Sequence, residues 1–236
     1  MSKTYFQFFK IIFDQNRFLG CGLEVGVWKG ESSVALLSML NANESLFLID
    51  KYFRDDARAF IDHFRLTHGL PAEVVCLAQD STKLDFKKVC DGRELKVALV
   101  DGEHSYEAVY SDLRGVQSVM HDYGVCIVDD FFNIHSSRIS QAVFDFTRES
   151  GNQLCVFAVT PNRAILVKRR VLGFYARAME SLISFMNMKG FMLHVGVPGF
   201  DYDGDGFSIQ PLPSTAKSNI YQCCGNYRAN FGDLLI

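Results

Sequence analysis

Several features that define other classes of protein are missing from this sequence. It has no long run of lysine and arginine and carries a formal net charge of −3, so we expect no nucleic-acid partner. No uninterrupted apolar run is long enough to span a bilayer. Charged residues also interrupt the N-terminal segment where a signal peptide would be apolar. We therefore expect no membrane partner either.

The cysteines show no paired spacing. There are seven of them, an odd number, and no C-x-x-C pair occurs. Several lie inside apolar runs, such as VVCL and VCIV. Free cysteine behaves as a small buried apolar residue, and disulfides are rare in reducing compartments. The pattern predicts buried free thiols and a cytoplasmic location.

The length and composition predict one α/β domain with an appendage. The chain has 236 residues, of which 48% are apolar and 22% are charged, as in soluble globular proteins. We divide it into an N-terminal helical segment (1–19), a ligand-binding domain (20–170) and a C-terminal helix with a cap (171–236). The end of the chain is rich in glycine, proline and asparagine, so we expect an irregular cap or a contact in a homo-oligomer.

Short apolar runs alternate with longer helical patterns. Strands that are buried on both faces of a parallel sheet consist of such runs. The runs are Cys21–Val25, Ser45–Ile49, Glu73–Leu77, Lys96–Val100 and Gly124–Val128. The helical segments are Ser32–Asn41, Arg54–His68, Ser105–Asp122 and Ser136–Ser150. The alternation predicts right-handed crossovers and a doubly wound, Rossmann-like α/β fold.

The end of this pattern differs from its beginning. Gln153–Val159 and Ala164–Lys168 are two strand-like runs separated only by Thr160–Arg163. So short a link permits an antiparallel hairpin and excludes a parallel crossover. We therefore expect a mostly parallel, seven-stranded sheet with a terminal antiparallel hairpin. An amphipathic helix over residues 172–186 is expected after it.

A glycine-containing loop follows the first expected strand and opens a helix. The string LEVGVWKGESS contains Glu24, Gly26 and Gly30, with Ser32 in the first helical turn. Glycines let the backbone turn sharply and approach a ligand, and free N–H groups at a helix start bind a carboxylate. Glu24 can face the cationic part of an amino-acid ligand. A tight turn without a ligand is the alternative.

Two further aspartates end the second and third expected strands. Asp50 can accept hydrogen bonds from both hydroxyls of a ribose, or it can be a solvated loop carboxylate. Asp80 can bind the exocyclic amine of adenine, or it can cap the next helix. Both alternatives stay open for each residue.

These strings together resemble those of the class I S-adenosylmethionine-dependent methyltransferases. The matching strings are LEVGVWKGESS, FLID, LAQDS, LVDGEHSYEAVYSDL and CIVDDF. They are most similar to the bacterial subgroup of macrocin-type and other sugar or natural-product O-methyltransferases. The resemblance covers roughly residues 20–170 and implies an S-adenosylmethionine-binding domain that releases S-adenosylhomocysteine. It implies that the cofactor site is lined by Glu24, Gly26, Gly30, Asp50 and Asp80.

Three carboxylates end the fourth and fifth expected strands. They are Asp101, Asp129 and Asp130, and adjacent parallel strands bring such residues to one edge of the sheet. Carboxylates in one crevice repel one another, and a divalent cation relieves the repulsion. Oxygen ligands suit Mg²⁺, so we predict a magnesium site, with Asn133 as a candidate fourth ligand. The alternatives are that Asp101 bonds its own loop and that Asp130 caps the next segment.

His104 lies three residues after Asp101, at the start of an expected helix. Imidazole has an ordinary pKa near 6.5 and can take the proton of a hydroxyl whose pKa a cation has lowered. In the metal-dependent sugar methyltransferases that this chain resembles, a histidine at this place is thought to act so. We predict His104 and Asp101 as catalytic residues, with Asp101 also contacting the cofactor. A histidine that caps the helix or contacts the cofactor is the alternative.

These residues predict a metal-assisted O-methyltransferase that acts on a small hydroxylated molecule, a sugar or a glycosylated natural product. A nicotinamide-dependent oxidoreductase is the first alternative, but the loop lacks G-x-G-x-x-G and the hairpin argues against it. A methyltransferase-like binding or assembly module without catalysis is the second. Asp201-x-Asp203-Gly-Asp205 is similar to the start of a calcium loop, but Leu212 stands where that loop needs glutamate, so we expect a polar turn.

Overall fold

The computed structural model is an α/β fold and describes residues 4–160, 162–188, 193–196 and 207–211. Its strands are β1 (Cys21–Val25), β2 (Ser45–Asp50), β3 (Glu73–Ala78), β4 (Leu95–Val100), β5 (Met120–Val128), β6 (Leu154–Val159), β7 (Ala164–Lys168), β8 (Leu193–Gly196) and β9 (Phe207–Pro211). Its helices are α1 (Thr4–Asn16), α2 (Glu31–Leu37), α3 (Asp55–Thr67), α4 (Phe86–Val89), α5 (Tyr106–Val119), α6 (Ser137–Arg148) and α7 (Leu172–Met188). Two 3₁₀ turns cover Ser81–Lys83 and Arg169–Val171.

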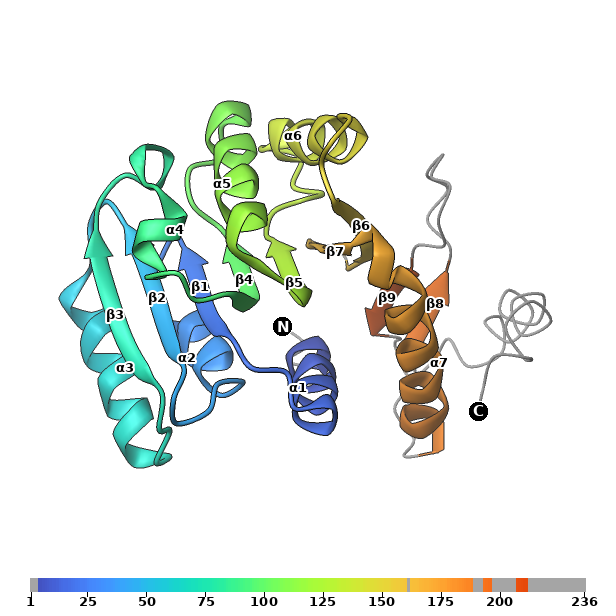
Figure 1. Ribbon diagram of the computed structural model, residues 1–236, viewed down its shortest axis with the longest axis horizontal. Coiled ribbons are helices and arrows are strands. Elements are labelled where there is room, and N and C mark those ends of the chain that lie inside the picture. Colours follow the sequence, from blue (N-terminus) through green and yellow to red (C-terminus); the bar gives the residue numbers. More distant parts are fainter. Residues whose placement is uncertain (1–3, 161, 189–192, 197–206, 212–236) are drawn as a thin grey trace.

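The strands form one sheet in the order β3-β2-β1-β4-β5-β7-β6-β9-β8 (Figure 1). Strands β1 to β5 are parallel to one another, whereas β7 is antiparallel to both β5 and β6. The order reverses at β1 and β4, because the chain crosses from one half of the sheet to the other there. The predicted Rossmann-like sheet with an antiparallel hairpin after its parallel strands is confirmed, and β9 and β8 extend it beyond the seven expected strands.

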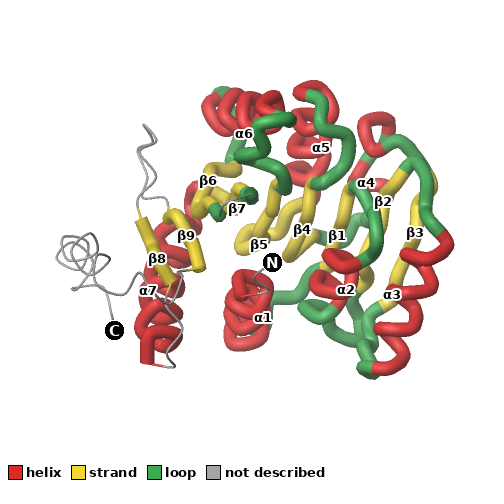
Figure 2. The backbone as a smooth tube through the Cα atoms, turned by 180° about the vertical axis from the view of Figure 1, so that it is seen from behind, coloured by secondary structure: helices red, strands yellow, loops and turns green. Residues whose placement is uncertain are grey.

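Helices cover both faces of the sheet (Figure 2). Buried side chains of α1, α2, α3 and α7 form one apolar cluster, and those of α4, α5 and α6 form the other. Strand β4 contributes to both, since Val97 and Leu99 belong to the first cluster and Ala98 and Val100 to the second. A strand that is buried on both faces has no polar alternate positions, which is why the strand sequences read as continuous apolar runs.

The structure differs from the expected elements at three places. Residues 120–122, expected at the end of a helix, begin β5, because Met120 pairs with Leu95 and its side chain is buried in the core. Helix α4 was not expected. Residues 193–196 and 207–211, expected to be irregular, form the antiparallel pair β8–β9, and β9 extends the sheet beside β6. Among the described helices, none has the length and apolar character needed to cross a membrane.

Candidate active site

The candidate residues lie at the carboxyl ends of β1, β2, β4 and β5. Backbone hydrogen bonds continue past the strands and align these ends with one another. Gly26 N donates to Ile49 O at 2.9 Å, and Asp101 N donates to Val25 O at 2.8 Å. Asp129 N donates to Val100 O at 3.0 Å. The parallel register therefore brings residues far apart in the sequence to one edge of the sheet, where open α/β sheets bind ligands.

The two glycines of the first loop are required by the protein's own packing. Both have left-handed backbones, with φ of 88° at Gly26 and 78° at Gly30. A Cβ atom on Gly26 would overlap the backbone carbonyl of Asp101, and one on Gly30 would lie 2.7 Å from Ile61 Cγ1. Gly26 thus lets the loops after β1 and β4 touch, and Gly30 lets α2 pack on α3. Contact of either glycine with a ligand stays a prediction.

Glu24 is the buried carboxyl of the first loop. The Ser33 hydroxyl donates a hydrogen bond to its Oε2 atom. Burial, with smaller contributions from the charges of Asp101 and Asp50, raises the pKa of Glu24 to about 8. The sequence interpretation placed Ser32 and Ser33 in the first helical turn and chose Ser32, which is half-buried, as a cofactor residue, but it did not foresee the bond of the Ser33 side chain to Glu24. Only helical geometry shows that the third residue of α2 turns back toward β1.

Asp50 joins the loops after β1 and β2. Val27 N donates to Oδ2 at 2.6 Å, and Tyr52 N donates to Oδ1 at 2.8 Å. Each carboxylate oxygen has a second lone pair, so the two oxygens can still accept bonds from a ribose. The backbone bonds fix the direction of the carboxylate. The ribose contact stays a prediction that this geometry permits.

Asp80 shows the capping interaction that the sequence left open. Its Oδ1 accepts hydrogen bonds from Thr82 N at 3.1 Å and from Thr82 Oγ1 at 2.7 Å. Its Oδ2 lies 3.6 Å from the ammonium groups of Lys51 and Lys83. These contacts, the Thr82 hydroxyl bond foremost, hold the pKa of Asp80 below its usual range. Contact with adenine stays a prediction.

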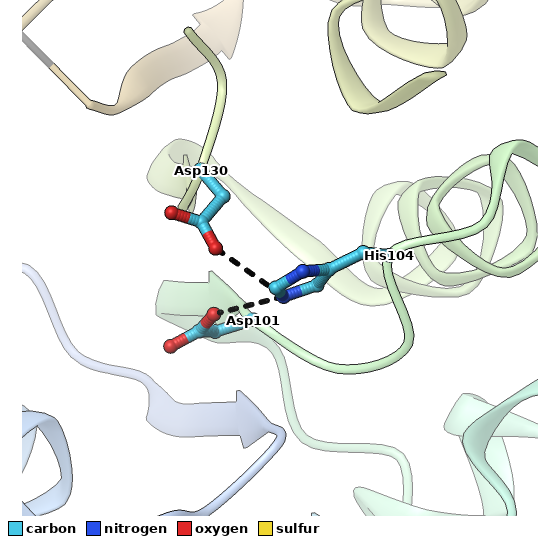
Figure 3. Close-up of side chains that lie close together, drawn as sticks. All are labelled: Asp101, His104 and Asp130. Atoms are coloured by element: carbon cyan, nitrogen blue, oxygen red, sulfur yellow. Dashed lines mark ion pairs between the residues drawn. The ribbon is translucent and has the colours of Figure 1, made fainter. Parts of the chain in front are cut away.

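Asp101, His104 and Asp130 point toward one another from the loops after β4 and β5 (Figure 3). His104 Nε2 lies 3.8 Å from Asp101 Oδ1 and 3.4 Å from Asp130 Oδ2. One candidate ligand atom from each residue lies within 4.8 Å of the others. Protein oxygen and nitrogen ligands lie about 2.0–2.6 Å from divalent cations, so one ion can reach all three. Burial and the charges of Asp129 and Asp130 raise the pKa of Asp101 to about 8, and a cation would remove that repulsion.

Asp129 and Asn133, the other predicted ligands, have different contacts. Asp129 is buried, and Arg163 Nη2 donates to its Oδ2 at 2.6 Å. Asn133 Oδ1 accepts a hydrogen bond from His135 N at 2.9 Å, within its own loop. Arg163 lies in the turn between β6 and β7, and only the pairing of β5 with β7 brings it to Asp129. Metal binding by Asp129 stays a prediction, against which its contact with Arg163 argues.

His104 does not cap α5. The cap is Ser105, whose Oγ accepts a hydrogen bond from Ala108 N at 3.2 Å. His104 Nδ1 instead lies 3.3 Å from Ser136 Oγ, and 41% of its side chain is exposed. An imidazole that is oriented by a hydroxyl at one nitrogen and open to solvent can exchange a proton at the other.

Asp112 is a buried carboxyl that the sequence interpretation missed. It lies on α5, its residue is 1% exposed, and no hydrogen bond of standard geometry from the described residues reaches either oxygen. Burial raises the pKa of Asp112 to about 7, although the Ser81 side chain partly offsets this. The helical period could have found it, because position 112 lies beside the buried positions Val109, Leu113 and Val116. Asp201, Asp203 and Asp205 lie outside the described residues.

Comparison with known proteins shows which family of domains this segment belongs to. Residues 23–131 match a family model described as a methyltransferase domain. This segment is a methyltransferase domain. It contains every candidate cofactor and catalytic residue from Glu24 to Asp130, so the resemblance found in the sequence strings is confirmed. No curated protein matches the chain significantly.

Solved structures of methyltransferases share the fold. The O-methyltransferase NovP has a TM-score of 0.57 at 16% identity, and CalS11, a TDP-rhamnose 3′-O-methyltransferase of calicheamicin biosynthesis, has 0.54 at 14%. For both, the match covers 70% of this chain and 78% of the other. The methyltransferase PaMTH1 of Podospora anserina, solved with S-adenosylhomocysteine, has 0.52 at 13% and covers 72% and 80%. The methyltransferase domain thus has the class I fold.

Proposed function

We propose that this methyltransferase domain transfers the methyl group of S-adenosylmethionine to a hydroxyl of a small molecule, a sugar or a glycosylated natural product. The observation that carries the proposal is the cluster of Asp101, His104 and Asp130 beside the first loop. It brings two carboxylates and an imidazole together at the carboxyl ends of β4 and β5, where open α/β sheets bind ligands. This acceptor class is supported by two proteins with the same fold, CalS11, a TDP-rhamnose 3′-O-methyltransferase, and NovP, an O-methyltransferase.

The first loop fits a cationic amino-acid ligand. The charges of Asp50 and Asp101 act on Glu24, so three carboxyl groups share this crevice. Such groups repel one another when ionised, and the ammonium and sulfonium charges of S-adenosylmethionine would relieve that repulsion. We assign Glu24 to the ligand's ammonium group and Asp50 to its ribose. The ligand supplies an electrophilic methyl group to the acceptor oxygen.

The cluster fits a divalent cation and a proton acceptor. We assign the cation to Asp101 and Asp130, where it would lower the pKa of the acceptor hydroxyl. His104 takes the hydroxyl proton at Nε2 while Ser136 orients the ring through Nδ1. As the acceptor oxygen binds the methyl carbon, the carbon–sulfur bond breaks and its electron pair stays on sulfur. The products are the methyl ether, S-adenosylhomocysteine and protonated His104.

Calorimetry and turnover test the proposal. We expect S-adenosylhomocysteine to bind the wild-type protein, and TDP-rhamnose is the first acceptor to assay with labelled S-adenosylmethionine. Replacing His104 with glutamine removes the base but keeps the size, so kcat should fall about 10²–10⁴-fold with unchanged S-adenosylhomocysteine affinity. EDTA should stop O-methylation, whereas methylation of an amine would survive it. Absence of S-adenosylhomocysteine binding at millimolar ligand would contradict the whole proposal.

A further inference from the structure

The hairpin turn between β6 and β7 reaches the end of β5. Its residues Asn162 and Arg163 lie outside the segment that matches the family model. The backbone joins the two loops first, because Phe131 N donates to Asn162 O at 2.9 Å. Strand β7 pairs with β5 from Val125↔Val167 to Val128↔Ala164, which fixes this turn beside Asp129 and Asp130.

The two side chains of the turn form hydrogen bonds with two consecutive aspartates, Asp129 and Asp130. Arg163 Nη2 donates to Asp129 Oδ2 at 2.6 Å, and both side chains are about nine-tenths buried, at 10% and 9% exposed. Asn162 Nδ2 donates to Asp129 Oδ1 at 3.1 Å and to Asp130 Oδ1 at 2.7 Å. Asp130 N also donates to Asp129 Oδ1 at 2.9 Å. Both oxygens of Asp129 are therefore engaged inside the protein.

Asp130 is left with one oxygen for the site. Asn162 holds its Oδ1, and its Oδ2 faces His104 Nε2 at 3.4 Å (Figure 3). The backbone of Asp130 is left-handed, with φ of 54°, which costs energy in a residue other than glycine. A strained conformation persists only where surrounding contacts impose it, and the contacts of Asn162 with Asp129 and Asp130 are of that kind.

We propose that Asn162 and Arg163 are positioning residues that decide which of the two aspartates serves the cation. Arg163 keeps Asp129 as an ion-paired structural carboxylate. Asn162 aims the second oxygen of Asp130 at the space it shares with Asp101 and His104. This inference rests on the proposed metal-assisted function. The family segment supplies both aspartates, and the hairpin selects between them.

Manganese affinity tests the selection, with Mn²⁺ as the probe and electron paramagnetic resonance as the readout. Hydrogen-bond partners of metal ligands change metal affinity about 10–100-fold when they are removed. Asn162→Ala should therefore weaken Mn²⁺ binding by at least about tenfold, while S-adenosylhomocysteine affinity stays within twofold of wild type. A general loss of structure would reduce both affinities, so the split separates positioning from folding.

A matched control comes from the same turn. Thr160 Oγ1 accepts a hydrogen bond from Arg163 N at 3.0 Å, and none of the side-chain hydrogen bonds found among the described residues joins it to either aspartate. Thr160→Val loosens the turn without removing an aspartate's partner, so its Mn²⁺ affinity should match that of wild type. An equal loss of Mn²⁺ affinity in Thr160→Val and Asn162→Ala would overturn the inference.

The two aspartates themselves give the second test. Asp130→Asn should lower Mn²⁺ affinity more than Asn162→Ala does, whereas Asp129→Asn should lower it less. The reverse order would show that Asp129 is the ligand and overturn the inference alone. If the wild-type protein fails to bind Mn²⁺ but binds S-adenosylhomocysteine, the metal-assisted function fails and this inference fails with it. Unchanged Mn²⁺ affinity in Asn162→Ala overturns the inference and leaves the proposed function standing.

Discussion

Gly26 shows how much a single residue contributes at this edge of the sheet. It has a positive φ, and the position of its missing Cβ is filled by the backbone of Asp101 and Gly102. Gly92 also has a positive φ, of 71°, but nothing lies within 4 Å of where its Cβ would be. A side chain at Gly92 would therefore meet only backbone strain, whereas one at Gly26 would meet both backbone strain and steric overlap.

Gly26→Ala should destabilise the protein far more than Gly92→Ala. Left-handed backbone costs a side-chain-bearing residue about 1–2 kcal/mol at either position. At Gly26 the overlap with a backbone that cannot move aside adds a further ~1–3 kcal/mol or more. Urea unfolding monitored by circular dichroism measures both variants. Equal free energies of unfolding would show that the loops after β1 and β4 do not touch as described.

Residue identity alone predicted only part of the site. Glu24, Gly26, Asp50 and Asp101 could be placed because each lies at, or directly after, the end of a recognisable strand. The side-chain contacts of Arg163, Asn162 and Ser33 could not be predicted, since they depend on the pairing of β5 with β7 or on the turn of α2 against β1. Sequence spacing carries no information about which of Asp129 and Asp130 an arginine 33 or 34 positions later will contact.

At the scale of elements, strands were easier to predict than the ends of helices. Two of the expected strands, Cys21–Val25 and Ala164–Lys168, have the bounds found in the structure. The four-residue link of the hairpin also sufficed to predict antiparallel pairing. The helix expected to end at Asp122 ends at Val119, because apolar Met120 satisfies a helical period and a strand equally well. Tertiary pairing with β4 decides between the two.

A buried ion pair joins the opposite, amino-terminal ends of β1, β2 and β4. Lys96 Nζ lies 2.5 Å from Glu44 Oε2, with side chains 0% and 5% exposed. Glu44 also accepts hydrogen bonds from Gly20 N at 2.8 Å and Asn41 N at 2.7 Å. Three elements therefore depend on one carboxylate, whose charge is balanced by one ammonium group.

Lys96→Met should be strongly destabilising. It keeps the length of the side chain but leaves Glu44 as an uncompensated buried charge, which costs about 3–5 kcal/mol. Adding Glu44→Gln should recover part of this, so a double-mutant cycle by urea unfolding should show a coupling of at least about 1 kcal/mol. Lys10→Met, which breaks the exposed Lys10–Asp14 pair on α1, should have little effect. If the losses in free energy of unfolding from the two substitutions were additive, a direct interaction between Lys96 and Glu44 would be contradicted.

At the scale of the whole molecule, the two ends of the parallel strands differ in how their charges are balanced. At the amino edge, charges are paired and buried. At the carboxyl edge, the charge of Asp101 acts on buried Glu24, and burial of Asp112 outweighs the effects of the Ser81 side chain and the Lys51 charge. Burial raises the pKa of Glu24 and Asp101 to about 8 and that of Asp112 to about 7. An edge prepared for a cationic ligand is a source of instability while the ligand is absent.

The free energy of unfolding should therefore fall as the pH rises from 6.5 to 8. In this range the three carboxyls are ionised in the unfolded chain but retain protons in the folded one, so folding binds protons and stability decreases with pH. Each group contributes up to ~1.4 kcal/mol per pH unit. His121, whose pKa burial lowers from 6.5, has the opposite effect, which is largest below pH 6.5 and fades as the pH rises above it. Urea unfolding in EDTA should show a shallower slope for Glu24→Gln and Asp112→Asn, but an unchanged slope for Asp91→Asn in an exposed loop. A wild-type slope of zero or above would mean that these carboxyls are ionised in the folded protein, and the first loop would then need no ligand to balance its charge.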